Sequence, residues 1–264
     1  MTIDIAGALE RGFDRLTTPT GAAFVSAFVG VAVAVGLLWE TVLGRFVAGD
    51  DFFSFVPPAA ARQLREAWAS YDVLVDLPIP VELLLGLLLG LWLCRLVLRI
   101  GAVRWFVGEA SQPLQAELFT RRLGWTLLNL IAGTILYGLA VAVGLVLLVL
   151  PGIFLAVALF FFNYEVVVEG ENAVDALANS YSLTAGNRIQ LLLLGVLFVA
   201  LGLVVSLAGS PTLLPGRLPP VIVGAAVTAA FGVYGIATAA DAYRQLTQEQ
   251  EIEEPVDDDL TAGP

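Results

Sequence analysis

The sequence contains no histidine, no lysine and one cysteine, Cys94. Without histidine, zinc sites and the common Ser–His or Cys–His catalytic pairs are excluded. One cysteine cannot form an intrachain disulfide, and within its apolar segment we expect Cys94 to pack as a small hydrophobic residue. The sequence also has no Walker P-loop and no GxGxxG between a strand and a helix. We therefore predict a protein without catalytic activity, cofactor or metal.

Charge is also scarce. Charged residues make up 14% of the 264 residues, whereas soluble domains carry about 25%. All 13 basic residues are arginine, and the 24 acids bring the net charge to −11, which argues against nucleic acid as a partner. An acidic, lysine-free chain suits the salt-rich cytoplasm of a halophilic archaeon. GC-rich codon usage combined with one acidic tail explains the composition equally well.

The longest charge-free run extends from Leu123 to Tyr164, between Arg122 and Glu165. As one helix, its 42 residues would measure about 63 Å. The hydrocarbon layer of a bilayer is only about 30 Å thick. The run must therefore turn back once, which makes the chain a polytopic membrane protein.

We predict an all-α integral membrane protein with one six-helix domain over residues 1–240. The expected transmembrane spans are 18–40, 80–101, 123–149, 152–168, 189–208 and 220–240. The uncharged part of the second span is too short to cross a membrane. The span must therefore include Glu82 at its N-terminus and Arg95 and Arg99, whose side chains would reach the opposite headgroups. Within 123–168, a type II turn at Leu150–Ile153 is favoured. Alternatively, Pro151 begins the fourth helix, or the turn lies nearer Gly144.

Three polar segments flank or connect these spans. Residues 3–16 place Ile5, Leu9, Phe13 and Leu16 on one face, which indicates a short interfacial helix. A second amphipathic helix is expected within residues 45–77, after Pro57–Pro58, with Arg62 and Glu66 on its wet side. Residues 241–264 are acidic and are expected to form a disordered tail.

The distribution of arginine predicts the orientation of the chain. With six spans, both termini lie on one side. A cytoplasmic N-terminus puts nine arginines inside and four outside, as the positive-inside rule requires. The nine are Arg11, Arg15, Arg95, Arg99, Arg104, Arg121, Arg122, Arg188 and Arg244, and the four are Arg45, Arg62, Arg65 and Arg217. We therefore expect a cell-membrane protein with both termini in the cytoplasm.

Few polar residues lie within the spans. Glu165, beside Asn163 and Tyr164, is either an ion or substrate contact or an anchor in the headgroup zone, and end-of-helix anchoring is the simpler interpretation. Asn129 is expected to form an interhelical hydrogen bond.

The most patterned polar stretch is residues 170–190. Its apolar positions share one helical face, and Asp175, Asn179 and Ser182 share another. Gly186–Asn187 can end this helix because both tolerate the left-handed conformation, and Arg188 then opens the fifth span. The segment is interpreted as a connecting helix on the cytoplasmic leaflet, or as a docking surface or lipid-headgroup site.

Residues 100–205 resemble several families of multi-pass membrane proteins, including the membrane domain of some glycerophosphodiester phosphodiesterases and bacterial inner-membrane proteins of unknown function. The stretch 119–133 is similar to an uncharacterised haloarchaeal branch. The matching elements are Leu150–Pro151–Gly152, Glu169–Gly170, Ala176–Leu177, Ser180–Tyr181, Leu183–Thr184 and Gly186–Asn187–Arg188. The resemblance implies six helices in a membrane. It implies no catalysis, because those phosphodiesterases use histidines in a separate soluble domain.

We therefore expect a membrane-organising or partner-binding scaffold whose partners are membrane lipids and another membrane or cytoplasmic protein. The alternative is a small permease or lipid-handling transporter. The candidate contact residues are Pro151, Gly152, Asn163, Glu165, Asp175, Ser180, Tyr181, Gly186, Asn187 and Arg188.

Overall fold

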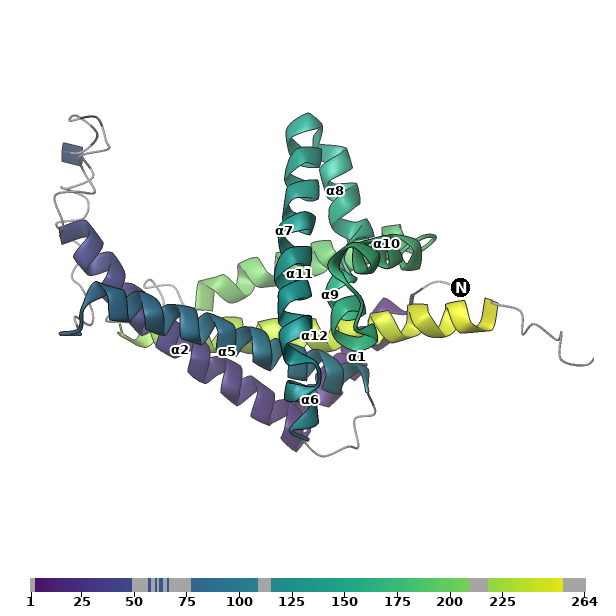
Figure 1. Ribbon diagram of the computed structural model, residues 1–264, viewed down its shortest axis with the longest axis horizontal. Helices are drawn as coiled ribbons and strands as arrows, with labels where there is room; N and C mark the ends of the chain where they lie inside the picture. The colour runs from purple at the N-terminus through teal and green to yellow at the C-terminus, as the bar shows by residue number, and fades with distance from the viewer. Residues whose placement is uncertain are drawn as a thin grey trace, which may run out of the picture. The chain divides into compact units, whose positions relative to one another are not determined.

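The computed structural model describes residues 3–48, 57, 60, 62–63, 66, 77–108, 115–208 and 218–253. Every regular element in those residues is helical, which confirms the predicted all-α class (Figure 1). The elements are α1 (Ile5–Thr17), α2 (Pro19–Ala48), α5 (Val81–Val107), α6 (Glu117–Thr120), α7 (Leu123–Leu147), α8 (Val149–Ala158), α9 (Phe162–Tyr164), the π-helix η1 (Glu165–Glu169), α10 (Ala173–Leu183), α11 (Arg188–Ala208) and α12 (Leu218–Glu253).

Six helical segments of the described chain are long and apolar enough to cross a membrane, as the sequence predicts. They are Pro19–Arg45, Val81–Val107, Leu123–Leu147, Val149–Glu169, Arg188–Leu207 and Val221–Gln250. The fourth is not one continuous α-helix, because it consists of α8, α9 and η1 in succession. The fifth matches its expected bounds, and Glu82 lies in the first turn of α5 as expected.

The C-terminal boundary of the sixth span was predicted incorrectly. Helix α12 contains 36 residues and continues to Glu253, so residues 241–253 are helical rather than disordered. Its length of about 54 Å exceeds the thickness of the hydrocarbon layer, about 30 Å. Tyr243 and Leu246 are buried, which explains why the helix persists past residue 240. The acidic residues beyond 253 lie outside the described part of the chain.

The turn between the third and fourth spans also differs from the favoured prediction. Leu148 alone is extended, with φ −159° and ψ 139°, and it separates α7 from α8. Pro151 is therefore in the first turn of α8, where its missing N–H costs no helical hydrogen bond. The prediction of a type II turn at Leu150–Ile153 is therefore wrong.

Two glycines allow α7 and α8 to pack side by side as a tight hairpin (Figure 1). A Cβ atom on Gly144 would lie 2.8 Å from Gly152 Cα, and a Cβ atom on Gly152 would lie 2.6 Å from Leu145 N. Farther along the hairpin, the Tyr137 hydroxyl donates to Ala156 O at 3.3 Å. The close backbone approach fixes the register of the two helices.

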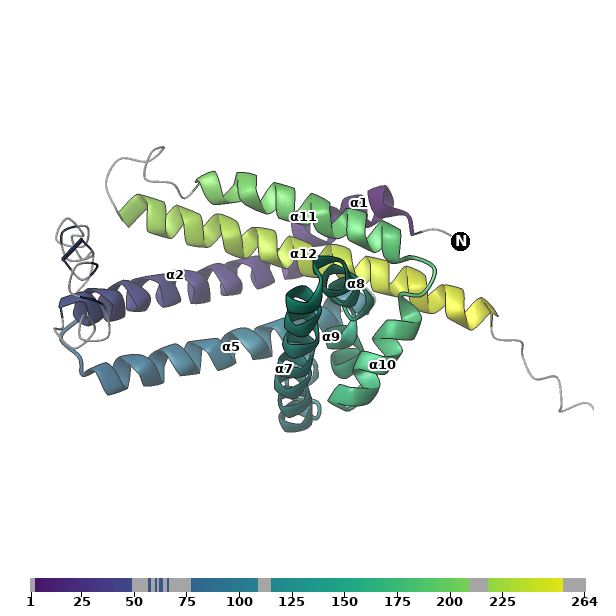
Figure 2. The same ribbon diagram turned by 90° about the horizontal axis from the view of Figure 1, so that it is seen from above.

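The described helices divide into two compact units. The first comprises Met1–Phe24, Arg99–Leu201 and Gly232–Pro264, and the second comprises Val25–Leu98 and Gly202–Phe231. In the first unit, Phe24 packs against the rings of Trp105, Phe106 and Phe119. Phe198 of α11 lies against Tyr234 of α12, with ring centroids 5.6 Å apart, and these two helices run side by side (Figure 2).

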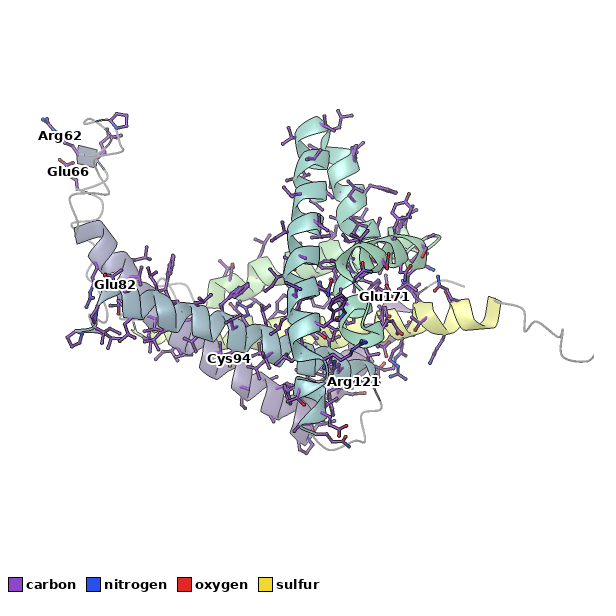
Figure 3. All side chains as sticks on the ribbon, in the orientation of Figure 1. Arg62, Glu66, Glu82, Cys94, Arg121 and Glu171 are labelled. Atoms are coloured by element: carbon purple, nitrogen blue, oxygen red, sulfur yellow. The ribbon has the colours of Figure 1, made fainter. Side chains whose placement is uncertain are left out.

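In the second unit, the Arg45 guanidinium donates to the carbonyls of Leu77 and Ile79, which precede α5. Cys94 of α5 is a free cysteine that is exposed on the apolar surface of its helix (Figure 3). Figure 3 also labels Arg62 and Glu66, but most of the second amphipathic helix predicted within 45–77 lies outside the described residues.

The predicted N-terminal helix forms as α1, although a different face is buried. Ala8 and Gly12 are buried, whereas Phe13 of the predicted apolar face is 60% exposed. Gly12 allows close approach, because a Cβ atom there would lie 2.6 Å from Thr238 Oγ1 of α12. The small residues therefore face the protein and leave Phe13 available to lipid.

The hairpin geometry predicts that Gly144→Ala destabilises the protein by about 1–3 kcal/mol, because the added methyl group would meet the Gly152 backbone. Gly138→Ala on the same helix is the matched control, since nothing lies within 4 Å of a Cβ atom there. Unfolding in mixed micelles, followed by tryptophan fluorescence, measures both variants. Equal stability of the two would contradict the hairpin contact.

Candidate functional site

Helix α10 begins at a side-chain cap. The Asn172 Oδ1 accepts hydrogen bonds from the backbone N–H groups of Val174 and Asp175, at 3.0 and 3.1 Å. The Asn172 side chain also donates to the carboxylate of Asp175, which is itself exposed. The cap therefore fixes the start of α10 and gives Asp175 a local structural partner.

The buried face of α10 consists mainly of small residues. Ala173, Ala176, Ser180 and Leu183 are buried, whereas Val174 is 65% and Tyr181 is 45% exposed. The N–H group of Ala173 donates to Asn129 Oδ1 of α7 at 3.0 Å, which confirms the predicted interhelical hydrogen bond. Helix α10 thus packs through one face and exposes both the apolar and the polar faces described from the sequence.

Hydroxyl groups of the α10 segment complete the hydrogen bonding where α8 ends. The Ser180 Oγ accepts from the N–H group of Phe161 at 3.0 Å and lies 3.3 Å from Ala158 O. Thr184 Oγ1 donates to the same carbonyl at 3.0 Å. All three of Ala158, Ser180 and Thr184 are fully buried, where unpaired backbone groups are costly. Ser180 therefore holds α10 against the C-terminal end of α8.

Arg188 lies between two aromatic rings at the start of α11. Its guanidinium carbon is 4.3 Å from the Tyr181 ring centroid and 4.7 Å from that of Phe154. Its Nη2 also donates to Tyr181 O at 3.0 Å. Gly186, with φ +86°, provides the left-handed turn that brings α11 back towards α10. Tyr181, Gly186 and Arg188 thus form one local structure.

Glu165 is the first residue of the π-helix η1 and is 6% exposed. Snorkelling requires a side chain that reaches the headgroups, so the interpretation of Glu165 as an exposed anchor is wrong. The Tyr243 ring stacks on Tyr164 at 5.4 Å, and its hydroxyl interacts with Glu165 and donates to Glu169 Oε1 at 3.5 Å. The neighbouring Asn163 has a buried Oδ1 without a hydrogen-bond partner among the described residues.

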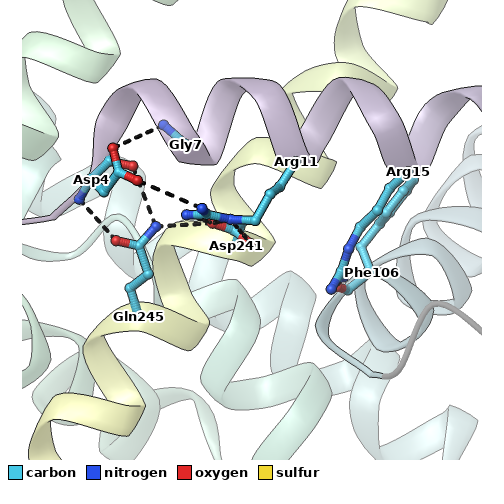
Figure 4. A network of polar contacts seen from close by, with 7 residues as sticks. All are labelled: Asp4, Gly7, Arg11, Arg15, Phe106, Asp241 and Gln245. Atoms are coloured by element: carbon cyan, nitrogen blue, oxygen red, sulfur yellow. Dashed lines mark hydrogen bonds and ion pairs between the residues drawn. The ribbon is translucent and has the colours of Figure 1, made fainter.

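A polar network joins α1 to the extension of α12 (Figure 4). Arg11 Nε lies 3.1 and 3.0 Å from the two carboxylate oxygens of Asp241, and its Nη2 lies 2.9 Å from Oδ2. Gln245 Nε2 donates to Asp241 Oδ2 at 2.9 Å, and its Oε1 accepts from the Asp4 N–H group at 2.9 Å. Asp241 is 4% exposed, so the network partners a buried carboxylate.

The sequence interpretation missed this network because it assigned residues 241–264 to a disordered tail. The available signal was helical spacing across that boundary. Ala239, Ala242, Tyr243 and Leu246 recur at i, i+3, i+4 and i+7, and all four are buried.

The surroundings of three charged residues outside the spans shift their pKa values. The hydrogen bond to Asp241 raises the pKa of Arg11, whereas burial lowers the pKa of Arg15, whose guanidinium donates to Phe106 O. Burial, followed by repulsion from Asp175 and Glu169, raises the pKa of Glu171. Figure 3 labels Glu171 beside α10, where Asn179 Nδ2 donates to its Oε1 at 2.6 Å.

The ten predicted contact residues do not form one centre. Ser180, Tyr181, Gly186, Asn187 and Arg188 gather at the end of α10, whereas Gly152 serves the α7–α8 hairpin and Glu165 faces Tyr243 of α12. Pro151 and Asp175 are exposed. Among the residues that the structure describes, no group of three His, Cys, Asp or Glu could hold a metal ion.

The fold defines a multi-pass α-helical membrane protein with an interrupted fourth span and a helical connector packed against the interruption. The chain belongs to the family described as "Domain of unknown function (DUF7847)", whose model matches residues 3–246. A search of curated proteins and a search of solved structures gave no match.

The network at Asp241 predicts that Arg11→Gln lowers the free energy of unfolding by about 2 kcal/mol, because it leaves a buried carboxylate without its cation. The double variant Arg11→Gln, Asp241→Asn should recover more than half of that loss, since two amides can pair. Glu10→Gln, at an exposed position on α1, is the control. If the double variant is less stable than Arg11→Gln, the ion pair does not carry the effect.

Proposed function

We propose that this protein is a non-enzymatic membrane scaffold that holds a partner at the exposed surface of α10. The observation that carries the proposal is the way in which α10 is fixed. Asn129, Ser180 and Asn172 position its backbone, while Val174, Ala178, Asn179 and Ser182 are exposed. A rigid helix with adjoining apolar and polar exposed faces suits docking against another protein at a membrane surface.

The proposed setting is the cell membrane, with both termini in the cytoplasm. Nine of the 13 arginines then lie on the cytoplasmic side, together with α10 and the extension of α12. The lysine-free acidic composition suits a halophilic archaeon. Residues 100–205 resemble the membrane domains of some glycerophosphodiester phosphodiesterases, and this resemblance favours a scaffold over an enzyme.

Site-specific photo-crosslinking in intact membranes tests the docking surface. A photoreactive residue at position 174 should give one discrete product of higher mass, because Val174 is 65% exposed on α10. Ala178→Arg, one turn further along the exposed surface, should reduce that product at least about fivefold, since an uncompensated charge at an interface costs about 1–3 kcal/mol.

The control probe replaces Phe13, which is 60% exposed on α1. The same product from positions 13 and 174, or no discrete product from position 174, would contradict docking on α10.

A second candidate function, a small permease, is favoured by the interrupted fourth span. Broken helices with buried polar groups are typical of transport sites. This span combines a π-helix, a buried Glu165 and an Asn163 oxygen for which the described part of the chain offers no hydrogen-bond partner.

Proton flux in proteoliposomes under a potassium diffusion potential separates the two functions. A scaffold should give no flux above that of empty liposomes. Flux that Glu165→Gln abolishes and that Glu82→Gln, at the exposed start of α5, leaves unchanged would establish the permease instead.

A further inference from the structure

Three arginines lie where α5 ends and α7 begins. Arg104 is in the last turn of α5, whereas Arg121 and Arg122 form the turn between α6 and α7, and Figure 3 labels Arg121 at the lower end of α7. Arg121 is close enough to Arg104 for their like charges to repel each other, and Arg121 and Arg122 are both exposed. Within the described part of the chain, no carboxylate forms an ion pair with any of the three.

Arg104 is held in place by neutral oxygens. Its Nε donates to Val167 O at 3.1 Å, and its Nη1 donates to Leu118 O at 2.9 Å. Its Nη2 donates to Thr126 Oγ1 at 3.2 Å, which ties the end of α5 to the first turns of α7. A guanidinium group has five N–H donors, so these contacts fix its position and leave both its charge and part of its donor capacity unused.

The backbone at Arg122 is strained. Its φ of +49° is left-handed, and Arg122 is the only described residue other than glycine with a positive φ. No side chain caps the helix α7 that begins at the next residue, so the N–H groups of its first turn add partial positive charge. The fold thus keeps a strained cation at an uncapped helix end, an arrangement that suits an anionic group.

The acids around these arginines are engaged elsewhere or stand alone. Arg122 Nη1 lies 3.8 Å from a Cβ atom built on Gly170, whose neighbours in the chain are Glu169 and Glu171. The Glu169 carboxylate accepts a hydrogen bond from a tyrosine of α12, and that of Glu171 accepts one from an asparagine of α10. Glu117, in the first turn of α6, is exposed and pairs with no described residue. The positive charge is therefore left for a ligand.

An exposed apolar stripe continues from this charge along α7, which is one of the candidate membrane spans. Its residues share one side of the helix and are Trp125, Leu128, Ile135 and Leu139, at 46%, 64%, 58% and 58% exposure. The Trp125 Nε1 donates to Gly170 O at 3.2 Å, which fixes the indole beside the arginines, and tryptophan is typical of headgroup depth. Charge followed by an apolar stripe matches a headgroup followed by acyl chains.

We propose that Arg104, Arg121 and Arg122 bind the phosphate of an anionic phospholipid, whose acyl chains lie along the exposed stripe of α7. Guanidinium groups and helix N–H groups donate to phosphate oxygens, and a bound anion removes the repulsion between Arg104 and Arg121. Basic sites between membrane-spanning helices commonly hold such headgroups. The proposal does not rest on partner docking at α10.

Native mass spectrometry of the full chain in neutral detergent micelles tests the site. The probes are dioctanoyl phosphatidylglycerol and dioctanoyl phosphatidylcholine, which share their chains and phosphate, although only the first has a net negative charge. Phosphatidylglycerol should bind at least about tenfold more tightly, and Arg121→Gln should weaken its binding at least about fivefold. Equal affinity for the two lipids would overturn the proposal.

Arg122→Gly separates binding from folding. Glycine adopts a positive φ without strain, so this variant should be at least as stable as the native protein, yet its affinity for phosphatidylglycerol should fall about fivefold. Arg95→Gln is the matched control, because Arg95 is exposed on α5 about 14 Å from Arg104 along the helix. An equal loss in the control, or unchanged affinity in both Arg121→Gln and Arg122→Gly, would show that these arginines do not form a specific site.

Inorganic phosphate distinguishes a lipid headgroup from a free anion. Added as a competitor to phosphatidylglycerol, it should have at least about tenfold lower affinity, because it has no chains to bury on the stripe. Phosphate that binds as tightly as the lipid would assign the arginines to a free anion and overturn the proposed lipid.

Discussion

The constraint on which this structure most depends is that backbone polar groups within a membrane must find partners inside the protein. The fourth span breaks its own helical hydrogen bonding after Ala158, and the connector supplies the missing groups through Ser180 and Thr184. This requirement holds α10 against the break. It also determines where the turn at Gly186 falls, and therefore where Asn187 and Arg188 face α12 and Phe154.

Close backbone packing and a paired buried charge hold other helices of the first unit together. Gly144 and Gly152 bring two backbones together, whereas Arg11 partners a carboxylate that α12 carries below the protein surface. Both arrangements depend on small or well-paired groups rather than on bulky apolar contacts. For the α7–α8 hairpin this is expected, because lipid already solvates large apolar side chains and helix association relies on close approach.

The sequence predicts the number of membrane spans well, because the length and low charge that a span needs follow from bilayer thickness. It predicts Asn129 for a similar reason, since an amide within a span needs a partner. Boundaries were harder to predict. Pro151 is compatible with a turn and with a first helical turn, and only the backbone at Leu148 decides between them. Glu165 interacts with Tyr243, 78 residues later in the chain, and this contact could not be predicted from its own neighbours.

The π-helical turn at Glu165–Glu169 has an evolutionary consequence. A π turn contains one residue more per turn than an α turn, so it is equivalent to a single insertion into an α-helix. Loss of one codon within this stretch would restore regular winding and swing every preceding side chain of the span by about 100° relative to Gly170. In a relative that lacks one position of this stretch, the acidic side chain would therefore point towards a different neighbour.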